Sequence, residues 1–213
     1  MILFLIIPLF MMVYVSFWTQ STFSISPDMT LQSWKTFFSS STYFGSLLRT
    51  IKIWLIVLFL TFIIGYPVAL FIGQFIKNKT LQTTLLVICV IPFWTSFLIR
   101  VLAWRPMLGK EGAINILLQK IGLISNPIEI LLFTELSVII GMVQIYVVFM
   151  VGPIAFMISR IDDSLIEAAR DLGASTYYIF VKIILPLSLP GVVVGAIFVT
   201  VMVLGEFATA SAL

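Results

Sequence analysis

The stretch EAARDLGASTYYIFVKIILP, Glu167–Pro186, interrupts an otherwise apolar part of the chain. The run before it, Leu136–Ser159, and the run that begins near its end, Ile183–Gly205, contain no Asp, Glu, Lys or Arg. The charged side chains of the quoted stretch are Glu167, Arg170, Asp171 and Lys182. A charged segment between two such runs is typical of a surface loop that joins two membrane-spanning helices. We call residues 160–186 the charged loop.

The composition supports a membrane protein. The chain has 213 residues, of which 61% are hydrophobic and only 10% are charged, too few to cover the surface of a water-soluble domain. The net charge of +3 is small and scattered, so it does not indicate a nucleic-acid partner. The absence of His excludes imidazole catalysis and His-ligated metal sites, and the single Cys89 cannot form an internal disulfide.

Charge-free runs predict the architecture. A helix needs about 20 apolar residues to cross roughly 30 Å of hydrocarbon, and backbone inside lipid must bond to itself. We therefore expect an all-α membrane protein, a single transmembrane domain over residues 1–213 with five spanning helices. The five runs are Met1–Pro27, Ile53–Ile76, Thr80–Ile99, Leu136–Ser159 and Ile183–Gly205.

Local signals predict a helix, a turn and a second helix in the charged loop. Ser164 followed by Glu167 reads as a capping box, so a helix should begin near Ser164. Gly173 suits the left-handed position that ends a helix. A second helical stretch is expected over Ser175–Ile184, ended by Pro186. From these residues alone two interpretations stay open: an element gripped by a partner from the aqueous side, or a polar connector with ordinary caps.

The long connection Arg100–Glu135 is expected to be a loop that contains one short amphipathic helix. Within Glu111–Ile121 the apolar side chains recur at helical spacing on one face, and Gly122 would end the helix. The neighbouring connection, Lys77–Lys79, is a tight basic turn. Counting Lys and Arg in the loops does not choose which side of the membrane is cytoplasmic.

The charged loop resembles the signature of permease subunits of binding-protein-dependent ABC importers. That signature reads Glu-Ala-Ala, three residues, Gly, nine residues, Ile, any residue, Leu-Pro, and lies before the penultimate helix. This chain keeps every spacing with Glu167, Ala168, Ala169, Gly173, Ile183, Leu185 and Pro186. The resemblance implies the fold of a type I importer transmembrane domain and a cytoplasmic loop whose coupling helix, within residues 164–186, docks on an ATPase subunit.

A second stretch resembles the first permease of spermidine/putrescine importers. It runs from Ile91 to Trp104 and continues over Leu108–Asn115, and LGEF at Leu204–Phe207 also fits. The matching residues are Pro92, Phe93, Trp94, Thr95, Ser96, Arg100, Ala103, Trp104, Gly109, Gly112 and Asn115. Arg105-Pro106 departs from the apolar residues expected there. Importers of thiamine, iron or other organic cations share parts of this pattern, so these substrates stay open as alternatives.

The resemblance implies a set of partners in the bacterial inner membrane. They are a second, similar permease, two ATPase subunits and a soluble extracytoplasmic binding protein, around a multi-pass chain with membrane lipid and no nucleic acid. ATP and Mg would be bound by the ATPase, with no cofactor in this chain. The family core has a further helix after the one that begins near Pro186, so a sixth helix is expected beyond Leu213. A membrane receptor or enzyme is the rival class, and an enzyme would need convergent catalytic groups that the spans do not contain.

Four residues are candidates for a cation pathway. Glu206 lies about 20 residues past Pro186, and burying its carboxylate is expensive unless it faces water or a partner. Trp94, Trp104 and Tyr146 could offer cation–π surfaces, although aromatic residues near an interface are often membrane anchors. Exposure at the interface is the alternative for Glu206.

Two glycine patterns have ordinary structural interpretations. Gly73-x-x-x-x-Asn78-Lys79-Thr80 nearly matches a phosphate-binding loop, but the second Gly is missing and the segment ends a membrane helix. Gly191-x-x-x-Gly195 is expected to mark close helix packing, with no partner identified.

Overall fold

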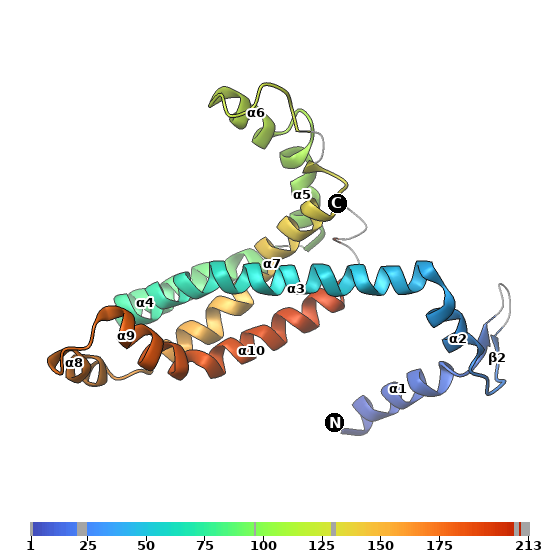
Figure 1. The fold of residues 1–213 in the computed structure, drawn as a ribbon, viewed down its shortest axis with the longest axis horizontal. Helices are drawn as coiled ribbons and strands as arrows, with labels where there is room; N and C mark the ends of the chain where they lie inside the picture. The colour runs from blue at the N-terminus through green and yellow to red at the C-terminus, as the bar shows by residue number, and fades with distance from the viewer. Residues whose placement is uncertain (1, 21–24, 96, 129–130, 207–208, 210–213) are drawn as a thin grey trace. The chain divides into compact units, whose positions relative to one another are not determined.

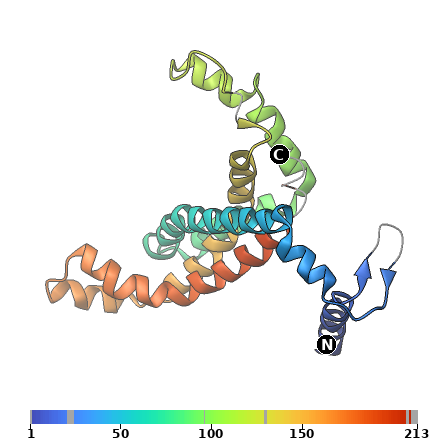
Figure 2. The same ribbon diagram turned by 45° about the vertical axis from the view of Figure 1, so that its right-hand side comes forward.

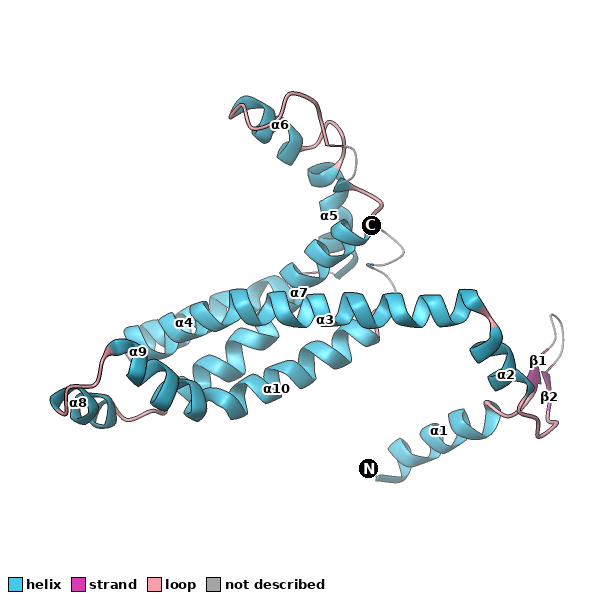
Figure 3. Ribbon diagram, viewed as in Figure 1, coloured by secondary structure: helices cyan, strands magenta, loops and turns pink. Residues whose placement is uncertain are grey.

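The structure is a computed structural model that describes residues 2–20, 25–95, 97–128, 131–206 and 209. The chain divides into two compact units, residues 1–52 and 53–213, and each is described by itself. The expectation of a single domain over residues 1–213 stays a prediction. Helices dominate the described residues, and the strands among them form one short antiparallel pair (Figure 3).

The first unit contains a shorter apolar helix than the sequence predicts. α1 spans Ile2–Val15, and a hairpin of β1 (Thr19–Gln20) and β2 (Ile25–Ser26) follows. The Met1–Pro27 run is uncharged, but its second half is rich in Ser and Thr, whose side chains compete for backbone hydrogen bonds. Ser16 shows this directly, because its hydroxyl donates to the carbonyl of Val13 at 2.6 Å just where α1 ends. α2 (Gln32–Ser39) and the beginning of α3 (Ser41–Leu70) complete the unit.

Three helical segments among the described residues are long and apolar enough to span a membrane. The first is α3 with the π-helix η1 (Phe71–Phe75) that continues it. The second is α7 (Glu135–Ile158). The third joins α9 (Thr176–Ile179), the π-helix η4 (Phe180–Ile184) and α10 (Leu185–Leu204). These segments correspond to three of the five predicted spans.

The predicted span Thr80–Ile99 is divided. It forms α4 (Lys79–Val90), one turn of 3₁₀-helix η2 (Ile91–Trp94) and the beginning of α5 (Phe97–Leu108). Pro92 lies in the break, and a proline cannot donate the backbone hydrogen bond that a continuous helix needs there. The expectation that the chain from Arg100 onward is a loop was wrong for residues 100–108, which are helical in α5.

α7 lies at the centre of the second unit and packs along α10 (Figures 1 and 2). A Cβ atom at Gly191 would lie 2.6 Å from the carbonyl oxygen of Pro153, and one at Gly195 would lie 2.9 Å from the sulfur of Met150. Both contacted residues belong to α7. The predicted packing role of the Gly191/Gly195 pair is confirmed, and its partner is α7 of the same chain.

Polar side chains link α3 to α10. The Tyr66 hydroxyl and the Ser188 hydroxyl are 2.8 Å apart in the core, and the indole N–H of Trp54 donates to Thr200 Oγ1 at 3.0 Å. The Tyr66–Ser188 pair satisfies two buried hydroxyls, which would be costly to leave unpaired in an apolar interior, and the Trp54–Thr200 pair is partly buried. The links therefore specify how these two helices face each other.

Candidate functional site

The charged loop begins with a helix whose cap differs from the predicted one. α8 spans Asp163–Asp171, and the side chain of Asp162 accepts a hydrogen bond from Ser164 N at 3.0 Å. The Ser164–Glu167 capping box was wrong, because Asp162 is the N-cap and Ser164 lies inside the helix. An aspartate is a better cap than serine here, since its negative charge also interacts favourably with the helix N-terminus. Hydrogen bonds from Ser164 hold the pKa of the Asp162 carboxyl below its usual range.

The turn after α8 follows the prediction. Gly173 has φ of +82°, so it occupies the left-handed position. Gly173 N donates to Arg170 O at 2.8 Å, and Ala174 N donates to Ala169 O at 2.9 Å. These two bonds form a Schellman motif, which satisfies the last carbonyls of α8 and reverses the chain.

The second helix of the charged loop does not end at Pro186. Ser175 caps α9, and the chain then passes through η4 into α10 without a break. Leu185 N donates to Phe180 O, five residues back, immediately before Pro186. In a regular α-helix, a proline ring clashes with the carbonyl oxygen four residues earlier. The π-turn immediately before Pro186 lengthens the hydrogen-bond spacing from four residues to five, which accommodates the ring. The charged loop from Thr176 onward and α10 therefore form one helical segment.

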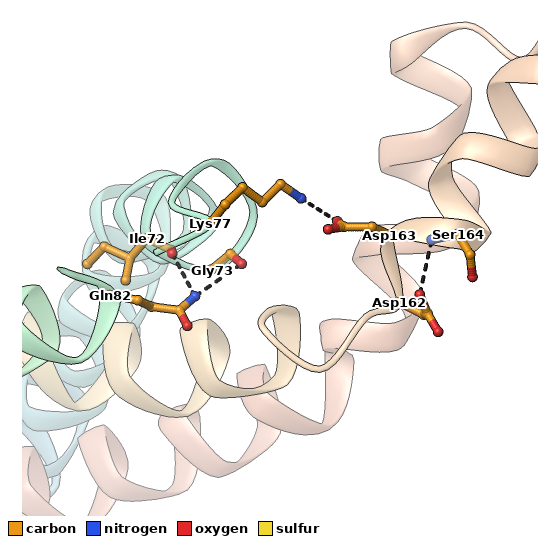
Figure 4. A network of polar contacts seen from close by, with 7 residues as sticks. All are labelled: Ile72, Gly73, Lys77, Gln82, Asp162, Asp163 and Ser164. Atoms are coloured by element: carbon orange, nitrogen blue, oxygen red, sulfur yellow. Dashed lines mark hydrogen bonds and ion pairs between the residues drawn. The ribbon is translucent and has the colours of Figure 1, made fainter. Parts of the chain in front are cut away.

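The charged loop is attached to the turn between η1 and α4. Lys77 forms an ion pair with Asp163 at the first residue of α8 (Figure 4). Nearby, the side-chain amide of buried Gln82 donates to Ile72 O at 2.9 Å and Gly73 O at 3.3 Å. Gln82 thus fixes η1 against α4. A cavity of about 290 Å³ lies between η1 and the charged loop, with Phe75, Ile166 and Phe180 in its wall.

The signature residues divide into an exposed group and a packed group. Glu167, Ala168, Gly173 and Pro186 are exposed, whereas Ala169, Ile183 and Leu185 are half-buried against the core. The structure also exposes two large apolar side chains that the sequence analysis passed over. Leu172 is 89% exposed and Tyr177 is 76% exposed, on either side of Gly173. Their position at the Gly turn was a signal that could have identified them.

The near match to a phosphate-binding loop is a helix cap. The side chain of Asn78 accepts hydrogen bonds from Thr80 N and Leu81 N, at 2.9 and 3.3 Å, and so begins α4. Gly73 lies within the π-helix η1, where a Cβ would approach Ile158 to 2.8 Å. Nothing in this arrangement resembles a loop after a strand. Within the described ranges, no group of three or more His, Cys, Asp or Glu residues is arranged to hold a metal ion.

The Gly109-x-x-Gly112-x-x-Asn115 pattern builds a closed turn between α5 and α6 (Ala113–Lys120). Asn115 is buried, donates to Gly109 O and Ile128 O, and accepts from Ile128 N at 2.8 Å. A Cβ at Gly112 would lie 2.5 Å from Met107 O. The predicted helix over Glu111–Ile121 is confirmed with slightly shorter bounds, and Gly122 follows it at φ of +76°.

Two of the four predicted pathway residues meet at a second cavity, of about 360 Å³. The hydroxyl of Tyr146, from α7, donates to one carboxylate oxygen of Glu206, which follows α10. The other oxygen accepts the backbone N–H of Thr209 at 2.9 Å. We call this space the Glu206 cavity. The residues that line it are Thr95, Arg100, Ile145, Tyr146, Val201, Met202, Gly205 and Glu206.

The other two pathway candidates do not line the Glu206 cavity. Trp94 is 86% exposed, and Trp104 is half-buried against the core. Arg100 does line it and was not predicted as a pathway residue, although it stands in the polyamine-permease pattern. Ser96 and Phe207 of the motifs lie outside the described residues.

Comparisons with known proteins point in one direction. The chain is 36% identical over 208 residues to the spermidine/putrescine transport system permease protein PotB of Escherichia coli K12, which covers 97% of this chain and 74% of that protein. It is 35% identical over its full length to the PotB protein of Haemophilus influenzae, covering 73% of that protein. The inner membrane ABC transporter permease protein YdcU of Escherichia coli K12 is 28% identical over 87% of this chain and 62% of its own. No model of a known protein family matches the chain.

Proposed function

This chain belongs to the family of ABC transporter permeases that includes the spermidine/putrescine permeases, and we propose that it forms part of the membrane path for polyamines. It is a transport subunit of the bacterial inner membrane, crosses that membrane several times and works with other subunits. The observation that supports a polyamine as the substrate is the 36% identity to PotB over 97% of the chain.

The proposed partners are a second permease, two ATPase subunits and a soluble extracytoplasmic binding protein. ATP and Mg would be held by the ATPase subunits. The charged loop would be cytoplasmic and would dock on an ATPase through α8 and the exposed turn at Leu172–Tyr177. Support for this docking surface comes from the family signature that it contains and from the high exposure of Leu172 and Tyr177 beside the Gly173 turn.

The structure offers a direct route for coupling. Residues Thr176–Leu204 form one helical segment, and Glu206 follows its end. A displacement of the charged loop would therefore be carried along α10 to the Glu206 cavity. That helix is also fixed to α7 through Gly191 and Gly195, so the two helices would move together.

The chemistry of the Glu206 cavity suits an organic cation. A carboxylate held by two donors still has acceptor capacity for an ammonium group, and the wall supplies a phenol and apolar side chains. A volume of about 360 Å³ lies within the range of about 300–1,000 Å³ typical of small-molecule sites. A transport path should attract its substrate without holding it tightly.

Reconstitution tests the proposal. The complete complex, with its neighbouring permease, ATPase and binding protein, would be placed in proteoliposomes and supplied with radiolabelled spermidine or putrescine. We expect uptake that requires internal ATP and the binding protein. Failure to take up either polyamine, with uptake of thiamine or iron instead, would contradict the substrate and leave the permease assignment in place.

A further inference from the structure

We propose that Arg100 is a resident cation of the Glu206 cavity, whose guanidinium repels a passing polyamine and so favours its release. The inference rests on the proposed function, because it assigns a role within the same pathway. Arg100 would set how long a polycation stays in the cavity.

The guanidinium of Arg100 lies at a break in a helix. α4 ends at Val90, the 3₁₀ turn η2 covers Ile91–Trp94 and α5 begins at Phe97, so Thr95 lies at the interruption between the two α-helices. Arg100 Nη2 donates to this carbonyl at 3.2 Å, and the Nε atom of the same side chain is covered by protein. Carbonyls at interrupted membrane helices are suited to binding cations. In this structure the cation bound there is part of the chain.

The carboxylate of Glu206 is held in place before any substrate arrives. Tyr146 and the backbone N–H of Thr209 bind its two oxygens, one each. A carboxylate has about four acceptor positions, so two remain for a further donor. Glu206 is therefore an oriented charge rather than a mobile one, and it cannot swing away to accommodate Arg100 without losing both bonds.

Together the two residues give the cavity one positive and one negative charge. Arg100 from α5 and Glu206 after α10 line the same space, although they are 106 positions apart in the chain. A polyamine that enters meets an attractive carboxylate and a repulsive guanidinium. Charges within one cavity interact by Coulomb's law, so the guanidinium repels each ammonium group that the carboxylate attracts. The guanidinium weakens the binding of a polycation and so favours its release, which a transport path needs.

A direct binding measurement tests the role of Arg100. The complete permease–ATPase complex would be placed in lipid nanodiscs without the soluble binding protein, and equilibrium binding of radiolabelled spermidine would be measured. We expect Arg100→Gln and Arg100→Met to bind spermidine about tenfold more tightly than wild type, since a like charge has been removed. Arg100→Lys, which keeps the charge, should bind like wild type. Glu206→Gln should bind more weakly, and the double variant Arg100→Gln/Glu206→Gln should lose the gain.

The matched control is Arg105→Gln. Arg105 is on the same helix α5, is exposed and does not line the Glu206 cavity, so its loss should leave spermidine binding unchanged. Unchanged or weaker binding in both charge-free Arg100 variants would overturn the proposal and leave Arg100 as a support for the helix break. Uptake by the wild-type complex is a separate result. If the wild-type complex takes up no polyamine, the proposed substrate is contradicted. If it takes up polyamine normally but spermidine binding is unchanged in the Arg100 variants, only the role of Arg100 is contradicted.

Discussion

Gly173 and Gly122 have the same backbone conformation at two different places in the chain. Their φ angles are +82° and +76°, and a Cβ atom at either position would meet nothing within 4 Å. A substitution at either one therefore costs backbone strain alone, about 1–2 kcal/mol for a residue forced into this region. The two glycines differ in their location: Gly173 forms the turn of the charged loop, whereas Gly122 follows α6.

We predict that Gly173→Val weakens docking of the ATPase while the permease stays in the membrane. The β-branched side chain resists positive φ, so the Schellman turn would rearrange and move Leu172 and Tyr177. Co-purification of the ATPase, with membrane level measured in parallel, reports the effect. Gly122→Val is the matched control and should dock normally. Normal docking of Gly173→Val would argue against the charged loop as the coupling element.

Asp162 makes the capping of α8 sensitive to pH. Its folded-state pKa is lowered by the hydrogen bonds from Ser164, so the unfolded carboxyl binds a proton more readily than the folded one. The stabilisation is therefore present above the unfolded pKa and is lost as pH falls through the lower, folded pKa. The protection factors of the α8 amides, which correct hydrogen exchange for its intrinsic pH dependence, should fall in that acidic window.

Substitution of Asp162 separates capping from charge. We predict that Asp162→Asn keeps the helix capped and removes the acid-dependent loss of protection, because asparagine caps a helix without titrating. Asp162→Ala should lower protection of the first turn of α8 at every pH above the folded pKa of Asp162, where the wild-type cap is intact. The same acid-dependent loss of protection in Asp162→Asn as in wild type would assign the effect to another group.

At the scale of elements, the contact between α7 and α10 depends on two glycines, whose lack of a side chain lets the helices approach closely. Gly191 lets α10 approach the backbone of Pro153 and Ile154 in α7, and Gly195 lets it approach Met150. Between membrane helices, close packing replaces the hydrophobic effect as the source of association. The pair of helices is therefore sensitive to a single added methyl group at the contact.

We predict that Gly191→Ala destabilises the permease by about 1–3 kcal/mol, the usual cost of overpacking. The new Cβ would lie 2.6 Å from a backbone oxygen that cannot move alone. Gly152→Ala is the control: Gly152 is also inside a helix, but a Cβ there meets nothing within 4 Å. Thermal unfolding of both variants in detergent would compare them, and equal melting temperatures would show that α10 does not need Gly191.

At the scale of the whole molecule, the charged loop and the Glu206 cavity lie toward opposite ends of one helical segment. The segment runs from Thr176 to Leu204, and its π-turn accommodates Pro186 without ending it. In the coupling that we propose, events at the loop alter the cavity, and a continuous helix is a physical means of transmission.

We predict that Glu206→Gln lowers uptake of spermidine several-fold in proteoliposomes while ATPase docking is preserved. The amide keeps the shape of the side chain but removes the charge that attracts a cation. Glu111→Gln, an exposed substitution outside the cavity, is the control and should transport normally. Equal uptake by Glu206→Gln and wild type would remove Glu206 from the pathway.

Much of the local structure was readable from the sequence. The charge-free runs located α3, α7 and α10, the glycines at 122 and 173 marked helix ends, and the spacing from Glu167 to Pro186 indicated the family. Such signals are local, because propensity, capping and turn chemistry depend on neighbours in the chain. Where two local signals competed, the prediction was wrong. Asp162, and not Ser164, is the N-cap of α8, and the π-helix η4 lets the helix continue through Pro186.

Only the tertiary structure brought Arg100, Tyr146 and Glu206 to one cavity. Their separation in the chain carries no information about distance, since three helices must first pack and one of them must break at Pro92. The sequence marked Glu206 as an expensive charge, and the identity of its donors, Tyr146 and Thr209, followed from the fold. The cost of burying a charge is a property of one residue, but the groups that offset it come from wherever the packing of helices places them.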